Sequence, residues 1–276
     1  MKPNQRKFLQ LFFGNKKAQS FFSKLHRFAL YGQYYGIGAF VEGSGERNVL
    51  ALLNKVPTAD RDKIILDVGA NRGEYALDVF RFVSGPKKVY AFEPVPATFE
   101  KLKENVKHNA HIFPYCLGIS AKTEKLTIYK SAKESKHASL YPRNMDHWDK
   151  DYSLNESEEV SLIALNEWAS RENVSHIDLL KMDAEGHEYS ILSGAEDWLK
   201  GQKIDLIQFE FGVCNVDSKV FFKDFFFLLN GNYKIFRILK NDFVEIKKYD
   251  ELLEVFLTTN YLAVSHVFYA RNKNLF

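Results

Sequence analysis

A short apolar run that leads into a glycine turn and then a helix constrains this chain most. Residues 64–75 read Ile-Ile-Leu-Asp-Val-Gly-Ala-Asn-Arg-Gly-Glu-Tyr, and a second apolar run at 88–92 is followed by Glu93. Glycines let the backbone turn tightly and admit a ligand without a Cβ in the way. An acid at the tip of the second strand is where a doubly wound sheet meets the hydroxyls of a ribose. The pattern predicts the nucleoside-binding half of an α/β fold.

The spacing of the glycines in the turn distinguishes between the cofactors that such a nucleoside-binding half can bind. A dinucleotide fold uses G-x-G-x-x-G against a pyrophosphate, whereas this chain has Gly69-x-x-x-Gly73 with Asp67 just before it. An acid beside the turn repels a pyrophosphate but suits the ammonium and sulfonium of S-adenosylmethionine. We therefore expect S-adenosylmethionine as the cofactor. A nicotinamide-dependent oxidoreductase is the alternative from another class of enzyme.

From residue 63 onward, apolar strands alternate with helices, which is typical of βαβ crossovers and a parallel sheet. The last third has strands without long helices between them, which predicts an antiparallel edge. Residues 121–161 break the pattern, with an irregular stretch at 131–159, and we predict an insertion that covers the acceptor site. The predicted strands are 63–68, 88–92, 112–117, 125–130, 177–182, 203–211, 233–238, 243–246 and 261–264, and the helices 46–53, 74–83, 97–109, 166–172, 188–199 and 218–229.

Residues 1–41 contain seven Lys and Arg side chains and no acid. Because the whole chain has a net charge of +3 and this segment carries +7, the remainder carries −4. That charge is a poor match for the phosphates of a nucleic acid, so we expect no nucleic-acid partner. Apolar side chains recur in the segment at helical spacing, which predicts one or two amphipathic helices. Packing of this face on the main domain is the favoured interpretation, and peripheral contact with an anionic membrane is the alternative.

We predict an N-terminal helical extension at 1–56 and a methyltransferase-sized domain at 57–276. No apolar run approaches the roughly 18 residues that span a bilayer. The polar residues 14–17 interrupt the first apolar stretch, unlike the cleavage region of a signal peptide. The two cysteines cannot build a disulfide framework or a thiolate zinc site. We expect a cytoplasmic protein that is either free of membranes or peripheral to one.

Three runs together resemble the FkbM family of S-adenosylmethionine-dependent methyltransferases. They are Asp67-Val-Gly-Ala-Asn-Arg-Gly73, Ala91-Phe-Glu-Pro94 and Leu180-Lys-Met-Asp-Ala-Glu-Gly-His-Glu188 with Gly194-Ala195, and an upstream Gly43-Ser-Gly-Glu46 is similar too. The resemblance implies a Rossmann-like class I methyltransferase fold, with a mostly parallel seven-stranded sheet and an antiparallel C-terminal edge. It further implies O-methylation of a sugar or glycan-type acceptor, free or lipid-linked. A polyketide or lipid hydroxyl is the alternative acceptor.

The same resemblance assigns the cofactor contacts residue by residue. They fall on the glycine turn, on the acid after the second strand and on the end of the third strand. The residues are Asp67, Gly69, Ala70, Asn71, Gly73, Tyr75, Glu93, Pro94 and Ser120. One departure is Ala164-Leu165-Asn166, where the family commonly has Thr-Leu-Asp, and no catalytic role rests on it.

Methyl transfer to a hydroxyl needs in-line alignment and a group that takes the hydroxyl proton or coordinates the oxygen. Asp183, Glu185 and His187 follow the strand at 177–182, where the active site of a parallel sheet lies. His187 is the predicted general base, beside Asp183, because an ordinary imidazole titrates near neutral pH. The alternative is that Asp183, Glu185 and His187 hold Mn²⁺ or Mg²⁺. His137 in the insertion is an alternative base.

Two further acids near the strands at 177–182 and 203–211 have alternative roles. Glu188 is as well explained by capping of the following helix as by function, and Glu210 would face the acceptor or pair internally. Enzymes that methylate a planar nitrogen typically carry an Asn- or Asp-Pro-Pro-aromatic run here, and this chain has Met182-Asp-Ala-Glu-Gly instead. A non-catalytic module that keeps the fold is a third class, and the acid cluster argues against it.

Overall fold

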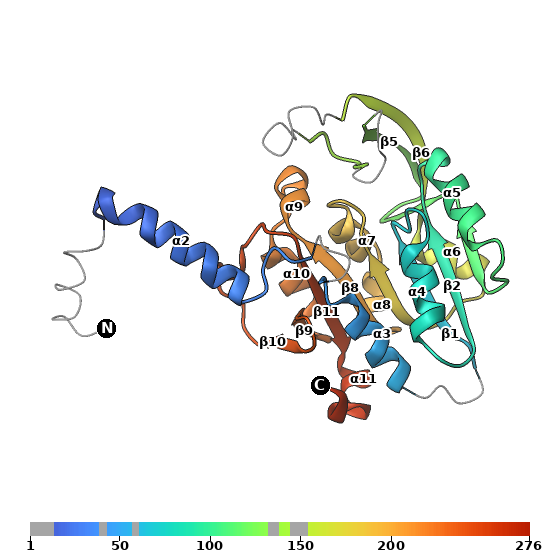
Figure 1. The fold of residues 1–276 in the computed structure, drawn as a ribbon. Helices are drawn as coiled ribbons and strands as arrows, with labels where there is room; N and C mark the ends of the chain where they lie inside the picture. Colours follow the sequence, from blue (N-terminus) through green and yellow to red (C-terminus); the bar gives the residue numbers. More distant parts are fainter. Residues whose placement is uncertain (1–13, 39–42, 57–60, 132–137, 144–153) are drawn as a thin grey trace.

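The computed structural model describes residues 14–38, 43–56, 61–131, 138–143 and 154–276. An eight-stranded sheet forms the centre and carries helices on both faces, and a smaller three-stranded sheet lies beyond one end of it (Figure 1). None of the described helices combines the length and the apolar character that crossing a bilayer requires.

The strand order of the large sheet is β10-β9-β11-β8-β7-β1-β2-β3. The five strands from β3 to β8 are parallel, and β11 runs antiparallel to both of its neighbours. The chain fills one side of β1 first and then crosses to β7 on the other, so the order reverses between these two strands. Their bounds are β1 Lys63–Val68, β2 Lys87–Phe92, β3 Ile112–Tyr115, β7 Ile177–Met182, β8 Ile204–Phe211, β9 Tyr233–Ile238, β10 Phe243–Ile246 and β11 Thr259–Ser265.

This topology confirms the predicted Rossmann-like class I methyltransferase fold, with its mostly parallel sheet and antiparallel C-terminal edge. The sheet has one strand more than the predicted seven, because β10 forms a hairpin with β9 and extends the edge. The predicted bounds of β1, β7, β9 and β10 agree with the structure.

The two faces of the sheet pack against two sets of helices, because successive strand residues point to opposite sides. In β1, Ile65 joins the core beneath α3, α4, α5 and α11, and Leu66 joins the core beneath α6, α7, α8 and α10. The bounds are α3 Glu46–Lys55, α4 Glu74–Phe82, α5 Pro96–Val106, α6 Leu165–Arg171, α7 Glu188–Gly194, α8 Glu196–Lys200, α10 Phe222–Leu229 and α11 His266–Arg271. Short segments complete the chain: α9 Val213–Ser218, η1 Glu251–Leu253 and η2 Lys273–Leu275.

The small sheet corrects two expectations. The predicted strand at 112–117 ends at Tyr115, and the chain continues as β4 Gly118–Ser120, which pairs with β6 Glu156–Ala164 instead of with β2. The stretch at 131–159, expected to be irregular, contains the first part of β6, which pairs along its length with β5 Glu124–Lys130. Ile128, Val160 and Leu162 give this sheet an apolar core of its own.

Two predicted helices are each divided. The segment at 188–199 becomes α7 and α8, which are separated at Ala195, where the backbone has φ −106° and ψ 22°. The preceding Gly194 packs closely on the residue after β4, because a Cβ there would lie 2.2 Å from Cα of Ala121. The segment at 218–229 becomes α9 and α10, separated by Lys219 in the left-handed conformation. Both breaks are local changes of backbone conformation, which no helical periodicity reveals.

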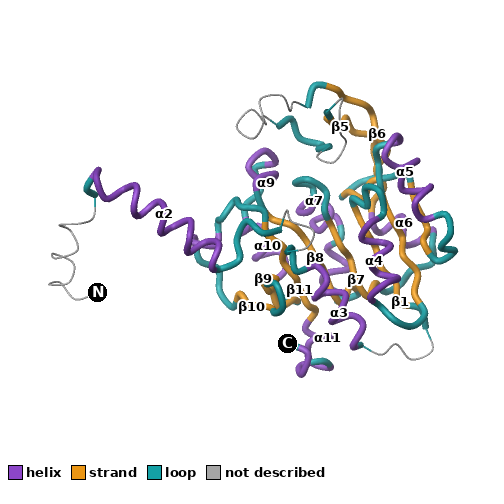
Figure 2. The backbone as a smooth tube through the Cα atoms, in the orientation of Figure 1, coloured by secondary structure: helices purple, strands orange, loops and turns teal. Residues whose placement is uncertain are grey.

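The N-terminal part divides into a helix that packs and one that does not. Val49, Leu50, Leu52 and Leu53 of α3 are buried in the main core. By contrast, α2 Lys16–Gly32 buries none of its residues and projects away from the rest of the molecule (Figures 1 and 2). The favoured expectation that this amphipathic face packs on the main domain is therefore wrong for α2.

Gly69 makes the closest approach between two strand ends. Its φ is +74°, and a Cβ there would lie 1.8 Å from the carbonyl oxygen of Asp183. Gly85 has a similar φ of +81° but nothing within 4 Å of such a Cβ. We predict that Gly85→Ala costs about 1–2 kcal/mol, the price of the left-handed conformation. Gly69→Ala should cost about 3 kcal/mol or more, because the chain must also move apart there. Urea unfolding of both variants measures the difference, and equal losses would contradict the close approach.

Candidate functional site

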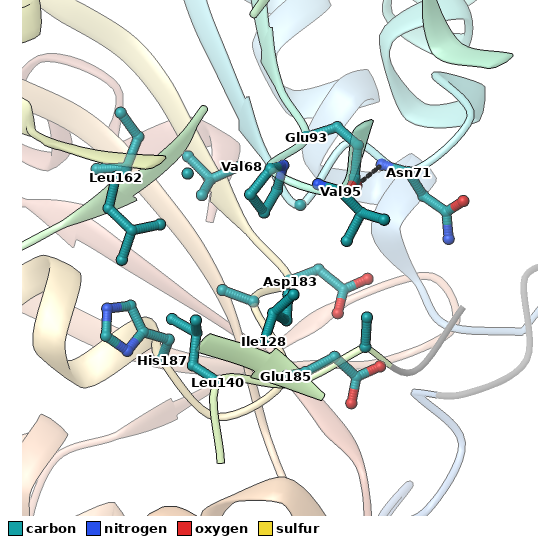
Figure 3. Close-up of a pocket in the computed structure, with 16 residues that line it drawn as sticks. Val68, Asn71, Glu93, Val95, Ile128, Leu140, Leu162, Asp183, Glu185 and His187 are labelled. Carbon is teal, nitrogen blue, oxygen red and sulfur yellow. Dashed lines mark hydrogen bonds between the residues drawn. The ribbon is translucent and has the colours of Figure 1, made fainter. Parts of the chain in front are cut away.

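A cavity opens at the carboxyl ends of β1, β2 and β7, on the edge where the strand order reverses. Its volume is about 680 Å³, open mouth included. The turn after β1, the segment after β2 and the turn after β7 form its polar walls, and the small sheet supplies an apolar one (Figure 3). Its lining includes Val68, Gly69, Asn71, Glu93, Pro94, Val95, Gly118, Ile119, Ile128, Leu140, Leu162, Asp183, Glu185 and His187. We call it the first cavity.

Glu93 is held in the first cavity by two backbone amides. Its carboxylate accepts hydrogen bonds from the N–H of Asn71 and the N–H of Val95, both at 3.0 Å. A carboxylate has about four acceptor positions, so two bonds fix its orientation without exhausting its capacity. Burial raises the pKa of Glu93 to about 7, against the effect of the two amides. Beside it, the buried Oδ1 of Asn71 has no hydrogen-bond partner within the described residues.

A second cavity of about 710 Å³ adjoins the first and shares Gly69, Asn71 and Asp183 with it. It lies on the side of α3 and α4, which contribute Glu46 and Tyr75. Among the described residues, six acidic side chains and two basic ones line the two cavities. The combined site is therefore suited to a ligand that carries positive charge.

A buried lysine connects the ends of β1 and β7. Lys181 and Asp67 are register partners on these parallel strands, and the Lys181 Nζ lies 3.2 Å from Asp67 Oδ1 and 3.7 Å from Asp183 Oδ2. The Asp67 side chain is fully buried, whereas that of Asp183 is 46% exposed. Burial by itself lowers the pKa of Lys181, but the charges of Asp67, Asp183 and Glu46 more than reverse this and raise it. The lysine therefore stays charged.

A second set of polar contacts joins α3 and α4 to the strand β8, near Lys181. The Gln208 amide donates to Glu46 Oε1 at 2.9 Å and accepts from the Tyr75 hydroxyl at 3.1 Å. Ser44 donates to the other Glu46 oxygen at 3.1 Å. Burial raises the pKa of Glu46, which the Lys181 charge partly opposes. The first residue of α3 is thus tied to the centre of the sheet.

His187 lies on the wall of the first cavity with both ring nitrogens engaged. Nε2 is 3.0 Å from the Ser120 hydroxyl, and Nδ1 is 3.1 Å from the Tyr141 hydroxyl. Burial lowers the pKa of His187 to about 4, so the ring is neutral and weakly basic. The expectation of a base with an ordinary imidazole pKa is wrong for this environment.

Glu185 is held by a cation from the inserted segment. Its Oε2 lies 2.7 Å from Nη1 of Arg143, and it accepts from the Cys214 thiol at 2.9 Å. The buried Arg143 side chain also reaches Asp217 of α9 at 3.2 Å, and Ser139 donates to the Glu185 carbonyl at 2.9 Å. These contacts fasten residues 138–143 over the turn after β7.

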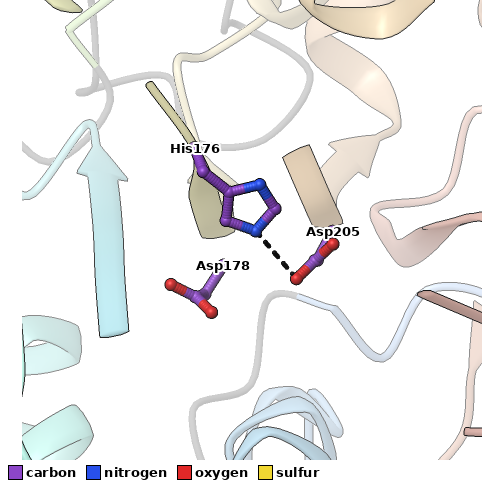
Figure 4. Close-up of side chains that lie close together, drawn as sticks. All are labelled: His176, Asp178 and Asp205. Carbon is purple, nitrogen blue, oxygen red and sulfur yellow. Dashed lines mark hydrogen bonds and ion pairs between the residues drawn. The ribbon is translucent and has the colours of Figure 1, made fainter. Parts of the chain in front are cut away.

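The structure does not gather Asp183, Glu185 and His187 into one ligand set. Within the described residues, ligand atoms close enough to share a metal ion come from His176, Asp178 and Asp205 (Figure 4). These lie at the opposite, amino-terminal end of β7 and β8. Both oxygens of Asp178 bind Arg61 at 2.7 Å, and His176 lies 3.0 Å from Asp205, so ion pairing accounts for the group.

The predicted site residues differ in their position relative to the two cavities. Gly69, Asn71, Glu93, Pro94, Asp183, Glu185 and His187 line the first cavity, and Ala70 and Tyr75 line the second. Three others line neither cavity. Asp67 lies behind the wall with Lys181, and Ser120 bonds to His187. Gly73 precedes α4, where a Cβ would lie 2.7 Å from Leu102. His137 lies outside the described residues.

The two acids outside these sets are also accounted for. Glu188 accepts hydrogen bonds from the amides of Ala184 and Gly186 at 2.6 and 3.1 Å, so its side chain fixes the turn between β7 and α7 and does not cap the helix. Glu210 is absent from the described walls of both cavities, and burial raises its pKa.

Sequence reasoning missed Lys181, Tyr141, Arg143 and Gln208 as site residues. Lys181 carried a usable signal, because a lysine inside a six-residue apolar strand needs a buried partner. Gln208 in the apolar strand β8 carried the same signal. Tyr141 and Arg143 follow no periodic pattern, so nothing in the sequence distinguishes them from other residues of the insertion.

Comparisons with known proteins identify the family of this chain. The family model described as the methyltransferase FkbM domain matches residues 67–247. The hexuronic acid methyltransferase AglP of Haloferax volcanii is 28% identical over 170 residues, which are 61% of this chain and 64% of that protein. The 2-O-methyltransferase NoeI of Sinorhizobium fredii is 26% identical over 162 residues, 55% of this chain and 63% of that protein. The chain thus covers less than two thirds of either relative.

Among solved structures, methyltransferase FkbM from Methylobacillus flagellatus KT aligns with a TM-score of 0.45 and 15% identity, over 78% of this chain and 47% of that one.

We predict that Lys181→Met lowers the free energy of unfolding by about 3–5 kcal/mol, because it leaves the buried Asp67 carboxylate without its cation. Adding Asp67→Asn should recover a substantial part of that loss, since the carboxylate that faced Lys181 across the strands is then no longer charged. Denaturant unfolding of the two single variants and the double variant measures the coupling. Additive losses in the double variant would contradict the pairing.

Proposed function

The chain belongs to the FkbM methyltransferase family, and from that premise we propose that it moves a methyl group from S-adenosylmethionine to a hydroxyl of a sugar. The observation that carries the proposal is the shared edge of β1, β2 and β7. There, Glu93 and the half-exposed carboxylate of Asp183 line the same cavity, which supports a nucleoside cofactor beside a group that can take a proton. The name of AglP, a hexuronic acid methyltransferase, supports a sugar acceptor, and that of NoeI, a 2-O-methyltransferase, supports methylation of an oxygen.

The residues present fit S-adenosylmethionine. Glu93, fixed by two amides, would accept hydrogen bonds from the ribose hydroxyls, and the unpartnered Asn71 Oδ1 offers a further acceptor nearby. The apolar side chains of Ile119 and Leu162 provide a surface for the flat adenine ring. The excess of carboxylates suits the sulfonium and ammonium charges. When bound, the cofactor supplies a methyl group on a cationic sulfur that is open to displacement.

Asp183 is the residue that we propose takes the acceptor proton. The acceptor oxygen forms a bond to the methyl carbon as the carbon–sulfur bond breaks, so its proton must leave. The Asp183 carboxylate is exposed on one side and lies 3.7 Å from the Lys181 cation on the other. Lys181 thus positions the carboxylate from behind, and its exposed side is accessible to an acceptor hydroxyl, whose proton becomes more acidic as its oxygen bonds to the methyl carbon.

His187 and Glu185 take other parts in this proposal. The neutral imidazole of His187, held between two hydroxyls, forms part of the nucleoside cavity and does not receive the proton. Glu185 anchors the inserted segment through Arg143. With Glu185 so occupied, a base mechanism through Asp183 is favoured over a Mn²⁺ or Mg²⁺ site built on Asp183, Glu185 and His187.

The charge of the site bears on the acceptor. Carboxylates outnumber basic groups in the described walls. Electrostatic repulsion would therefore weaken the binding of an anionic sugar but not that of a neutral one. We therefore propose a neutral sugar hydroxyl as the acceptor, although the relative AglP is named for a hexuronic acid. A polyketide or lipid hydroxyl remains the alternative class.

Radiolabelled methyl transfer to a panel of neutral glycosides, matched hexuronates and hydroxylated lipids tests the proposal. We expect neutral glycosides to be labelled and Asp183→Asn to lower turnover by about 10²–10⁴-fold. That variant should bind S-adenosylhomocysteine within about threefold of the unaltered protein. His187→Gln is the contrast: it should weaken S-adenosylhomocysteine binding by up to about tenfold and reduce turnover at saturation less than Asp183→Asn does.

Three results would each overturn a part of this assignment. Full turnover in Asp183→Asn would show that another group takes the proton. Loss of activity in EDTA with recovery in Mn²⁺ or Mg²⁺ would replace the base with a metal. Labelling of hexuronates in preference to neutral glycosides would contradict the acceptor class alone.

The pKa of Glu93 predicts how cofactor affinity depends on pH. Ribose hydroxyls donate to the ionised carboxylate, so binding favours loss of the Glu93 proton. Because the pKa is about 7, the ionised fraction rises as pH increases through neutrality. The Kd for S-adenosylhomocysteine should therefore fall by up to about tenfold from about pH 6 to about pH 8. Calorimetry at several pH values measures it.

Two variants serve as controls for this pH dependence. Glu93→Gln should bind more weakly and lose the pH dependence, whereas Glu100→Gln, which alters an acid on the exposed side of α5, should retain it. A Glu93→Gln variant with the original slope would sink the ribose assignment.

A further inference from the structure

We propose that α2 docks this protein on an anionic lipid surface, a property beyond the proposed methyl transfer. The helix has seventeen residues, none of them buried. Its apolar side chains are exposed: Phe21 by 62%, Leu25 by 47% and Phe28 by 74%. Large apolar side chains at such exposure normally mark a surface that meets something else.

These side chains occupy one side of the helix. With 3.6 residues per turn, the spacing of Phe21, Leu25 and Phe28 places them in a single stripe. Lys17 and Lys24 fall along one border of that stripe, and Lys16 and Arg27 lie farther round the same side. An apolar stripe bordered by cations is the arrangement of helices that lie in a membrane interface, where the stripe enters the acyl boundary and the cations meet the lipid phosphates.

The charge of the whole chain favours lipid over other occupants. Residues 1–41 carry +7 and the remainder −4, so an anionic surface attracts the helix and repels the body. A second copy of the chain would bring one basic helix against another, which opposes pairing through this stripe. An acidic protein surface would also attract these cations. A lipid surface in addition offers acyl chains to the apolar stripe along its full length.

The residues directly after α2 are attached to the rest of the molecule. Docking of the helix would therefore orient the whole molecule relative to the lipid surface. Tyr35, just after the helix, is buried, its hydroxyl accepts a hydrogen bond from Arg237 at 2.6 Å, and the Arg237 guanidinium lies 4.3 Å from its ring centre. The next segment bonds to the start of β11, through Gly36 to Thr259 and Gly38 to Thr258. Thr259 is paired with Phe211, the last residue of β8.

That attachment lies at the carboxyl end of the parallel strands, the edge that carries the two cavities. The apolar surface also continues onto the body there, because Gly36 adjoins both the Tyr31 ring and the exposed Leu257. A lipid surface against α2 would therefore meet the molecule at the edge where the proposed site lies.

Co-sedimentation of the full chain with lipid vesicles tests the proposal. We expect binding to phosphatidylcholine vesicles that contain about 30% phosphatidylglycerol, and little binding to phosphatidylcholine alone. Binding should weaken as salt is raised from about 50 mM to about 500 mM, because exposed charges are screened. Phe21→Ser with Phe28→Ser should lower the partition coefficient by about tenfold or more. Lys17→Glu with Lys24→Glu should lower binding to the anionic vesicles alone.

Phe227→Ser is the matched control, because Phe227 is 58% exposed on α10 and lies outside α2. It should leave vesicle binding unchanged. Because the altered α2 side chains are exposed, circular dichroism and thermal unfolding of every variant should match the unaltered protein. This excludes misfolding as the cause of lost binding.

Three outcomes would overturn the proposal. One is an absence of binding to the anionic vesicles at low salt. Another is vesicle binding that the paired Phe21 and Phe28 changes leave intact. The third is a lipid-free dimer, seen by sedimentation equilibrium, that dissociates in the same paired variant, since the stripe would then be an interface between copies. Unaltered methyl transfer to a free glycoside in that variant would show that docking and catalysis are separate properties.

Discussion

The ammonium of Lys181 is the centre on which the arrangement of the site depends. Asp67 and Lys181 lie opposite each other on two adjoining parallel strands, and both side chains point to the face covered by α3 and α4. A single buried charge there would be costly, and the pair makes the position tolerable. Because Lys181 also faces Asp183, the carboxylate that we propose receives the acceptor proton is placed by the same contact.

The close packing of strand ends completes this arrangement. The turn at Gly69 runs against the backbone of Asp183, and its amide bonds to the carbonyl of Phe92 at the end of β2. The next residues carry Asn71 to the Glu93 carboxylate. Three strands therefore hold the walls of the first cavity through backbone contacts, which do not depend on mobile side chains. Glu93, Asn71 and Asp183 are thus all held by the packed ends of β1, β2 and β7.

The sequence predicted those parts of the fold and site that follow from local patterns. Glu93 and Asp183 come directly after buried strands, and the carboxyl ends of parallel strands must meet at one edge, so their approach was foreseeable. The environment of His187 was not, because its pKa depends on burial beneath a segment with no periodicity. The small sheet was missed for a similar reason. The chain changes partner at Cys116 and Leu117, and only the pairing of β4 with β6 reveals it.

The described residues 138–143 of the inserted segment bond to the turn after β7, to α9 and to β5. Arg143 binds Glu185 and Asp217, Tyr141 bonds to His187, and the backbone of Ser139 pairs with that of Tyr129. Most of the apolar wall of the first cavity comes from this segment and the small sheet, whereas the Lys181 pair and the Glu93 carboxylate belong to the large sheet. The two walls are therefore built by different parts of the chain, which Arg143 and Tyr141 join at the turn after β7. A lineage could remodel one wall, and with it the molecules admitted, while the other retains its chemistry.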